Sequence, residues 1–143
     1  MTPNSAVTGG AAVLSFVVPE GCAGSPTRSL EISIPAEIDT VKPQPKAGWT
    51  IALTQEPLPK PIEDHGVVQK DRVSKIKWTG GPLADSHFEQ FVLIVRVPAK
   101  VGKLYFPAVQ TCEQGELRWT KVPGETPPLK AQPAPALTVI AKS

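Results

Sequence analysis

The chain has 143 residues, enough for one domain, and its 41% hydrophobic and 20% charged residues predict a packed core and exclude global disorder. Lys and Arg number 15 against 13 Asp and Glu, and this net charge of +2 is too small to indicate a nucleic-acid partner. The 17 prolines and 11 glycines leave few uninterrupted windows of helical length, so helical folds are disfavoured and an all-β domain is expected.

The first half of the chain contains short segments in which apolar and polar residues alternate, as in half-buried strands. Residues 2–10 are polar and rich in turn-forming types, and residues 56–66 (EPLPKPIEDHG) are predicted to form a loop because they contain three prolines. The strands predicted in this half are residues 11–18, 28–34, 38–41, 49–55 and 72–78.

Basic residues recur on alternate positions around the last of these segments: Lys70, Arg72, Lys75 and Lys77. This spacing is typical of the solvated face of a strand. A nucleic-acid interface would instead combine a basic patch with interleaved aromatic residues, so no such partner is expected.

The second half begins with a turn at residues 79–82 (TGGP). Residues 88–97 are the longest predicted strand, which we expect to be buried on both faces in its second half. Residues 104–111 and 117–119 are predicted to be two strands joined by a turn at 113–116, where Gly115 can adopt a positive φ. Residues 121–128 are expected to be a loop, and the segment 129–143 to contain a closing strand.

About eight or nine short strands, with turn signals every 8–12 residues, predict a single immunoglobulin-like β-sandwich over residues 1–143. A β-barrel fits the same pattern less well. No internal repeat and no convincing helix is present in the sequence. The apolar run at residues 11–19 is too short and too interrupted for a signal peptide or a membrane span.

The two cysteines, Cys22 and Cys112, are 90 positions apart and both lie beside predicted strand ends. In an exported domain such a pair is expected to form a disulfide, whereas in a reducing cytosol both would be buried thiols. Shared metal ligation is a weaker alternative, because two thiolates without a CxxC motif are a poor zinc signature.

Residues able to perform catalysis are few, and no enzymatic activity is expected. The two histidines, His65 and His87, lie in predicted loops, and neither has a second metal ligand at short spacing. No GxSxG motif and no Gly-rich phosphate loop occurs. The carboxylate pairs Glu63–Asp64 and Glu113–Glu116 lie in loops, where carboxylates are usually solvated.

The three tryptophans have two interpretations, as core residues or as site residues. Burial of the indole with one partner for its N–H is the expectation for Trp49 and Trp78. Trp119 follows a polar turn and an arginine near a sheet end, so both interpretations remain open for it.

Four sequence motifs occur in an order and spacing that resemble the YcnI-like family, also described as DUF1775. They are residues 19–27 (PEGCAGSPT), 41–50 (VKPQPKAGWT), 76–98 (IKWTGGPLADSHFEQFVLIVRVP) and 102–119 (GKLYFPAVQTCEQGELRW). The resemblance extends from Pro3 to Pro135, and its cysteine pair is similar to that of the branch in which the two cysteines are bridged.

The resemblance implies an exported bacterial protein with an immunoglobulin-like β-sandwich, often with a C-terminal membrane anchor outside the segment compared. It implies Cu(II) binding by the amine and imidazole of an N-terminal histidine, helped by a carboxylate and a nearby tryptophan. Nitrogen-rich tetragonal donors suit Cu(II), and an adjacent indole can restrict access to the ion. The implied role is that of a copper chaperone or sensor working with copper-transport or copper-resistance membrane proteins.

Carried over to this sequence, Trp119 matches the tryptophan of the family. The carboxylate is less defined, because Gln90 stands where the family often has Glu before the Phe of the long strand. Glu89 lies one position earlier, on the opposite face of a strand, and Glu113 in the turn is a second candidate. The family's N-terminal histidine is absent. Either the domain has been shortened, with Met1 added as the new first residue, which we favour, or this member lacks the ligand. In both cases this chain is expected to bind little or no Cu(II).

Two functions are compatible with these residues. The first is an exported Cu(II)-binding domain for copper homeostasis. The alternative is an immunoglobulin-like module of the cell envelope that recognises another protein without metal. The first requires an N-terminal histidine and a carboxylate near Trp119, whereas the second requires an exposed apolar patch.

Overall fold

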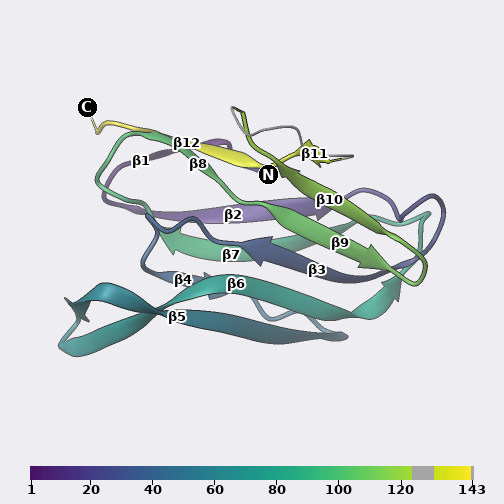
Figure 1. Ribbon diagram of the computed structural model, residues 1–143, viewed down its shortest axis with the longest axis horizontal. Helices are drawn as coiled ribbons and strands as arrows, with labels where there is room; N and C mark the ends of the chain where they lie inside the picture. The colour runs from purple at the N-terminus through teal and green to yellow at the C-terminus, as the bar shows by residue number, and fades with distance from the viewer. Residues whose placement is uncertain (124–130, 143) are drawn as a thin grey trace.

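The computed structural model describes residues 1–123 and 131–142, and the regular structure of these residues consists of β-strands (Figure 1). Each strand follows from an alternation of buried and exposed residues or from pairing with a neighbour. The strands are β1 (Ser5–Val7), β2 (Ala11–Val18), β3 (Thr27–Ser33), β4 (Val41–Pro43), β5 (Trp49–Asp64), β6 (Val67–Leu83), β7 (Glu89–Arg96), β8 (Gly102–Tyr105), β9 (Ala108–Cys112), β10 (Glu116–Lys121), β11 (Gln132–Pro133) and β12 (Ala136–Ile140).

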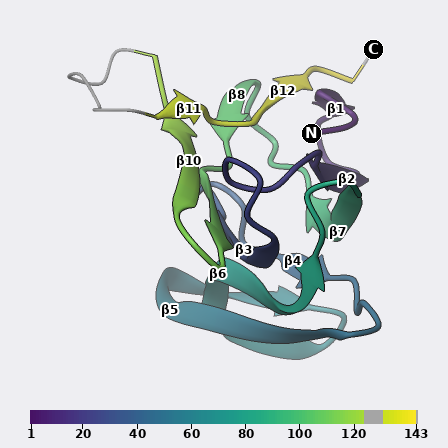
Figure 2. The same cartoon turned by 90° about the vertical axis from the view of Figure 1, so that its right-hand side faces the viewer.

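The strands form three sheets around one core. The largest has the order β11-β10-β9-β3-β6-β5, and the two others have the orders β2-β7-β4 and β1-β12-β8. Figure 2 shows the large sheet curling along one side, β2 and β7 on the opposite side, and β12 with β8 at the top. This arrangement confirms the predicted all-β, immunoglobulin-like sandwich.

Aromatic side chains fill the centre of the core. Trp78, Phe91 and Phe106 are almost fully buried, and the rings of Trp78 and Phe91 lie 5.4 Å apart. Trp49 packs its ring edge-to-face on Phe91 at 5.1 Å, and Phe16 contacts Phe106 at 5.8 Å. Such pairs add to the stabilisation that burial of their large apolar area provides.

The predicted proline-rich loop at residues 56–66 is wrong, because β5 continues through it to Asp64 and pairs with β6. The physical reason is the sheet order: β5 is an edge strand, and proline is tolerated where its missing N–H would face solvent. The register shifts between Pro57 and Ile62, which accommodates the intervening prolines. The hairpin beyond Gln55 and Val73 extends past β3, and we call this part the arm (Figure 1).

The predicted turn at residues 79–82 is also wrong, since these residues lie within β6. Glycine is needed at position 80 because the backbones of β6 and β5 approach each other closely there, and not because the chain turns. A Cβ on Gly80 would lie 2.2 Å from the carbonyl oxygen of Gly48 and 2.8 Å from Cα of Trp49. A side chain at this position would therefore push the start of β5 away from β6.

The segment predicted as one strand at residues 104–111 is divided between two sheets. It forms β8 and β9, with Phe106 and Pro107 crossing between them. Pro107 has no N–H for a continuous ladder, and the N–H of Phe106 instead donates to the carbonyl of Pro135 at 2.8 Å. The hairpin from β9 to β10 is confirmed, and Gly115 has φ 91° as the turn requires.

Smaller corrections concern β1, β4 and β7. The N-terminal segment predicted as turns contains β1, which pairs in parallel with β12. The strand predicted at residues 38–41 lies later, at β4, while Ile38 is buried in the preceding loop. Only one face of β7 is fully buried, because Ile94 is 41% exposed. The loop predicted at residues 121–128 lies partly outside the described residues, and the closing strand is confirmed as β12.

Arg72 was expected on the solvated face of its strand but is only 5% exposed. Its Nε donates to the carbonyl of Ile38 at 3.2 Å, and its Nη2 donates to the carbonyls of Ile34 at 2.7 Å and Pro35 at 2.9 Å. Its Nη1 donates to Glu56 of β5. Because these partners satisfy the guanidinium, Arg72 can be buried and fastens the arm to the loop after β3.

Candidate functional site

One apolar pocket brings the N-terminus of the chain to Trp119. Its volume is about 320 Å³, and we call it the N-terminal pocket. Trp119 and Met1 are both half-buried there and pack against the core. The pocket is lined by Met1, Phe16, Val17, Val18, Pro19, Leu30, Ala108, Trp119, Pro133 and Pro135.

Backbone hydrogen bonds position both Met1 and Trp119 in this pocket. Thr2 exchanges two backbone hydrogen bonds with Ser15 of β2, at 2.9 and 2.8 Å, which holds the residue before it against the end of β2. Trp119 lies in β10, opposite Ala108 of β9 and Gln132 of β11. The pocket is therefore formed where the first residues and β2 meet β3, β9, β10 and the segment before β12.

Glu89, the first carboxylate candidate, does not line the N-terminal pocket. Its Oε1 pairs with Nζ of Lys46 at 2.7 Å and also accepts the backbone N–H of Gln90 at 2.9 Å. Burial raises the pKa of Glu89, but the hydrogen bonds and the charge of Lys46 outweigh it, so the pKa lies below its ordinary value of 4.5. Glu89 is thus held as a charged partner of Lys46, which lies over the ring of Phe91 at 5.5 Å.

Glu113, the second candidate, lies in the turn between β9 and β10. Its backbone N–H donates to the carbonyl of Pro26 at 2.9 Å, and its side chain is exposed. Trp119 is three pairs further along the hairpin than Glu116, so roughly 10 Å of strand separates it from the turn. The structure therefore does not bring Glu113 and Trp119 together.

The histidines are also separated from this pocket. His65 occupies the turn at the tip of the arm, with φ 50°, and His87 is exposed in the loop before β7. Among residues 1–123 and 131–142, no group of three or more His, Cys, Asp or Glu side chains is arranged to hold a metal ion. The donor set for a metal is therefore not assembled by the described side chains alone.

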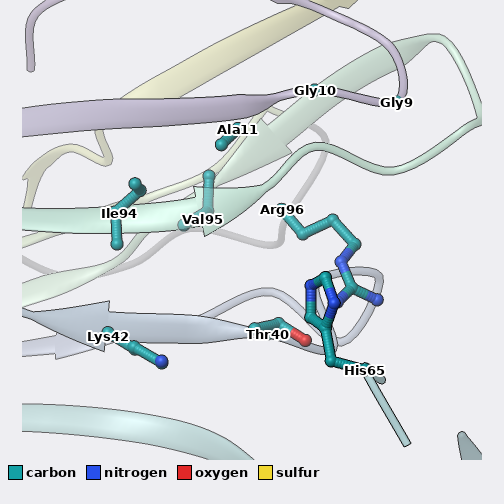
Figure 3. Close-up of a pocket in the computed structure, with 9 residues that line it drawn as sticks. All are labelled: Gly9, Gly10, Ala11, Thr40, Lys42, His65, Ile94, Val95 and Arg96. Atoms are coloured by element: carbon teal, nitrogen blue, oxygen red, sulfur yellow. The ribbon is translucent and has the colours of Figure 1, made fainter. Parts of the chain in front are cut away.

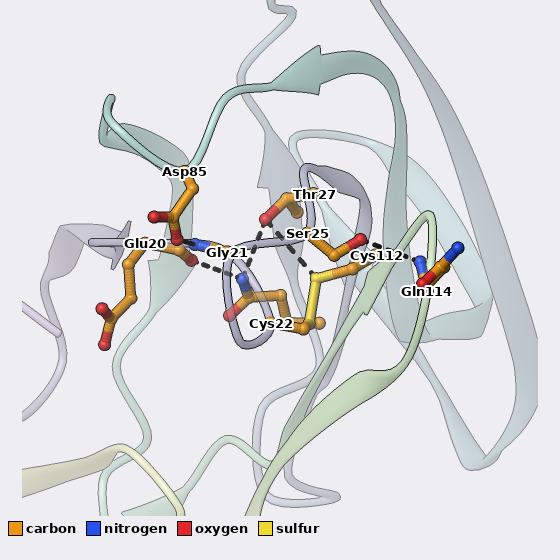
Figure 4. Close-up of a disulfide and its surroundings, with 9 residues drawn as sticks. Glu20, Gly21, Cys22, Ser25, Thr27, Asp85, Cys112 and Gln114 are labelled. Carbon is orange, nitrogen blue, oxygen red and sulfur yellow. Dashed lines mark hydrogen bonds between the residues drawn. A yellow bond between two sulfur atoms is a disulfide. The ribbon is translucent and has the colours of Figure 1, made fainter.

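The predicted disulfide is confirmed: Cys22 and Cys112 are bonded, with their Cα atoms 6.0 Å apart (Figure 4). It links the loop after β2 to the end of β9. Gln110 is fully buried beside it and donates from Nε2 to the carbonyl of Glu20 at 2.7 Å and to Oγ1 of Thr27 at 2.8 Å. The metal and free-thiol alternatives for this pair are thereby excluded in this structure.

The loop around Cys22 is held by further contacts from distant segments. The backbone N–H of Gly21 donates to Oδ1 of Asp85 at 2.9 Å, and the N–H of Gln114 donates to Oγ of Ser25 at 2.9 Å (Figure 4). A Cβ on Gly21 would lie 2.0 Å from the carbonyl oxygen of Ser25, so this tight loop requires glycine.

The core interpretation is confirmed for Trp78, whereas Trp49 packs against the core and stays partly exposed. Trp78 is fully buried, and its Nε1 donates to the carbonyl of Gln44 at 3.3 Å. Trp49 is half-buried against Phe91. Trp119 has both features discussed for it, since it packs on the core and also lines the N-terminal pocket.

Sequence reasoning missed Met1 and the two prolines Pro133 and Pro135 as pocket residues. Their position depends on pairing between segments more than 100 residues apart, as in the register of Ser5 with Thr138. The spacing of PxP at residues 133–135 was the one local signal, because prolines interrupt a ladder and leave room beside it.

Comparisons with known proteins agree with this architecture. A family model described as "Domain of unknown function (DUF1775)" matches residues 1–139. The chain is also similar to an uncharacterised protein from Nocardia farcinica whose crystal structure has an immunoglobulin-like fold. That likeness has a TM-score of 0.68 and 24% identity, covering 94% of this chain and 91% of the other. The comparison with curated proteins found no significant match.

Proposed function

We propose that this chain, which belongs to the DUF1775 family, is an exported Cu(II)-binding domain that delivers or senses copper and is not an enzyme. The observation that carries the proposal is the N-terminal pocket, where Met1 and Trp119 line the same space. An N-terminal amine beside an indole is the arrangement that the resemblance implies for copper.

The N-terminal pocket supplies mainly apolar side chains and few groups that could bind a metal ion. Apart from Met1 and Trp119, the residues that line it are apolar, and they include Phe16 and Leu30. Such walls would exclude water from an ion and restrict its access to reductants. Copper would be the cargo of this domain, and its exchange would take place at the open side of this pocket.

The residues present do not complete a Cu(II) donor set. The α-amine of Met1 is one nitrogen donor, whereas neither Glu89 nor Glu113 lines the pocket. We therefore propose that tight binding requires a histidine with a free amine at the N-terminus of a longer chain. The chain beginning at Met1 is expected to bind Cu(II) weakly.

The proposed location outside the cytoplasm agrees with the disulfide, since such bonds persist in oxidising compartments. None of the residues in the described ranges forms a helix that could span a bilayer. Copper-transport or copper-resistance membrane proteins are the proposed partners, and a membrane anchor is proposed to lie outside this sequence.

The direct test is a Cu(II) titration of two proteins, followed by EPR and tryptophan fluorescence. One protein is the present chain and the other is extended upstream so that a histidine with a free amine comes first. We expect a tetragonal, nitrogen-rich EPR signal and quenched fluorescence only for the extended protein. An extension that begins with alanine is the matched control.

The role of Trp119 is tested by Trp119→Phe in the extended protein. Because the indole lies in the pocket, its replacement should remove most of the quenching and change the rate of copper reduction by ascorbate. If the histidine-first protein binds no more tightly than the alanine-first control, the copper proposal is wrong.

A module for protein interaction, without metal, is the alternative function. Aliphatic side chains on the outer face of β2 and β7 favour it: Val13 is 56%, Val17 45% and Ile94 41% exposed. Neighbouring exposed aliphatic residues on one sheet face are typical of contact surfaces. This function predicts a partner from the cell envelope whose binding is lost in Val13→Glu and unaffected by copper.

A further inference from the structure

The sheet edges of this domain are places where another chain can pair with it, because an edge strand leaves one row of N–H and C=O groups without a partner strand. Proteins block such edges with very short strands, prolines or lysines. Most edges formed by the described residues are blocked in this way. β1, β8 and β11 have three, four and two residues. β4 has three residues, including Lys42 and Pro43, and Figure 3 shows the side chain of Lys42 extending from this strand. The edge of β2 is covered at Ser15, which pairs with Thr2.

The first half of β5 is an exception. Residues 49–55 (WTIALTQ) contain no charged residue and no proline, and they include the β-branched Thr50, Ile51 and Thr54, which favour strands. The prolines of this strand begin only at Pro57. Among the residues that the structure describes, β6 is the strand paired with β5, and Figures 1 and 2 both show β5 on the lower side of the molecule. The side of residues 49–55 that faces away from β6 is therefore an open edge.

The hydrogen bonds of β5 show which backbone groups face this open edge. The carbonyl oxygens of Gly48 and Thr54 accept hydrogen bonds from groups of β6, at 3.4 and 3.2 Å, so both face β6. In an antiparallel pair the backbone groups of alternate residues face the partner strand, and the register with β6 has no shift before Thr54. The N–H and C=O groups of Ile51 and Leu53 therefore point away from β6, toward the open edge.

The sequence of this edge is nearly symmetric about Ala52. On either side of it, Ile51 and Leu53 are both aliphatic, and Thr50 and Thr54 are identical. If two copies pair in antiparallel fashion with a two-fold axis at Ala52, Ile51 of one copy lies opposite Leu53 of the other, and Thr50 lies opposite Thr54. Such aliphatic and Thr–Thr pairs stabilise antiparallel strands. This symmetry suits a second copy of the same chain, whereas an unrelated strand would not require it.

The side chains at the edge also favour this pairing. Leu53 is 46% exposed, whereas Ile51 is partly buried and packs against the core. Pairing places Leu53 of each copy against Ile51 of the other and removes apolar surface from water. The first charged residue beyond this stretch, Glu56, lies opposite Gly48 in the same register, so no like charges face each other.

We propose that two copies of this chain associate through the first half of β5, with Ile51 and Leu53 exchanging backbone hydrogen bonds across a two-fold axis at Ala52. The pairing joins the two large sheets into one continuous sheet. The interface is small, so the association is weak, with a Kd between about 10 μM and 1 mM. None of residues 49–55 lines the N-terminal pocket, so this association is separate from the copper proposal and does not depend on it.

The first measurement is sedimentation velocity of the chain across this range of concentration. We expect the weight-average mass to rise from that of one chain toward that of two. Hydrogen exchange should slow with concentration at Ile51 and Leu53, whose N–H groups face the open edge, and not at Ala52, whose N–H group faces β6. A chain that stays monomeric throughout the range overturns the proposal.

Substitution of Ala52 tests the position of the axis. Ala52 is exposed and lies opposite its own copy, so Ala52→Lys brings two ammonium groups together and Ala52→Glu brings two carboxylates together. We expect each variant alone to associate about tenfold more weakly than the parent, because like charges directly opposite each other are destabilising. An equimolar mixture of the two variants should regain the association, because opposite charges then face each other.

Val68→Lys is the matched control for Ala52→Lys. Val68 is 58% exposed on β6 in the arm, outside the paired stretch, so its substitution should leave the association unchanged. Ala52 lies opposite Lys77 of β6, and thermal unfolding of each variant checks that the fold is retained.

Three results of these substitutions would overturn the proposal. Ala52→Lys associates as tightly as the parent, or Val68→Lys weakens the association equally. The third is a mixture of Ala52→Lys and Ala52→Glu that fails to regain the association, because the two copies would then not meet at Ala52.

Discussion

The two ends of this sandwich are closed by different chemistry. At one end a covalent bond between Cys22 and Cys112 joins the loop after β2 to β9. At the other end the arm is fastened by the hydrogen bonds of buried Arg72. The covalent end is held by a chemical bond, whereas the arm end depends on the hydrogen bonds of one buried guanidinium.

The largest expected loss of stability comes from Arg72→Ala at the arm end. Removing the guanidinium leaves the carbonyls of Ile34, Pro35 and Ile38 without their donor, and we expect a loss of about 3–5 kcal/mol in the free energy of unfolding. Urea denaturation measures this loss, and hydrogen exchange should show it first in the arm.

Glu56→Gln is the matched control for this substitution. Glu56 is half-exposed at 51%, and an exposed partner contributes little, so its replacement should cost under about 1 kcal/mol. An equal loss from both substitutions would show that the ion pair, and not the carbonyl contacts, fastens the arm.

Removing the disulfide should cause the next largest loss of stability. Replacing Cys22 and Cys112 together by alanine opens a link across 90 residues, and we expect a loss of about 2–4 kcal/mol. Calorimetry of the double variant measures it. Since the two ends share no partners, the losses from this variant and from Arg72→Ala should add within about 0.5 kcal/mol. A clear departure from additivity would contradict the independence of the two ends.

The smallest loss of stability is expected from Glu89→Gln. Glu89 lies next to Lys46 and has a lowered pKa. A carboxyl with a pKa lowered by folding stabilises the protein above its unfolded pKa, and this stabilisation is lost as the pH falls through the folded pKa. Because its side chain is 35% exposed, we expect Glu89→Gln to cost about 0.2–1 kcal/mol at pH 7.

The difference between Glu89→Gln and the parent should begin to shrink below the ordinary pKa of 4.5 and should disappear once the pH is below the lowered pKa of the folded state. Urea midpoints measured from pH 3 to pH 7 test this dependence. A difference that is the same at every pH would mean that Glu89 acts through packing and not through its charge.

Local pattern was sufficient to predict much of the fold. The strand predicted at residues 11–18 coincides with β2, because this mostly apolar run ends at Pro19. The β9–β10 hairpin and the pairing of the cysteines followed from turn chemistry and from the resemblance. What local pattern could not provide is sheet order: the prolines of β5 are tolerated only because that strand lies at an edge.

The candidate site was less predictable for the same reason. Trp119 was a predicted site residue, but Met1 and Pro135, which line the N-terminal pocket with it, come from the two ends of the chain. Glu89 and Glu113 were chosen by resemblance to the carboxylate of the family, and the structure places them outside the N-terminal pocket. Arg72 shows the limit most clearly: its charge predicted exposure, while its burial depends on three carbonyls that are distant in sequence.

The parallel pairing of β1 with β12 has a mechanical consequence. The register joins Ser5 with Thr138 and Val7 with Ile140, so the first and last strands run side by side in the same direction. A pull applied to the two ends of the chain loads these strands in shear, and the hydrogen bonds between them must break together rather than one at a time. A domain tethered to a surface by one end would therefore withstand force on the other end better than an antiparallel terminal pair, which would unzip.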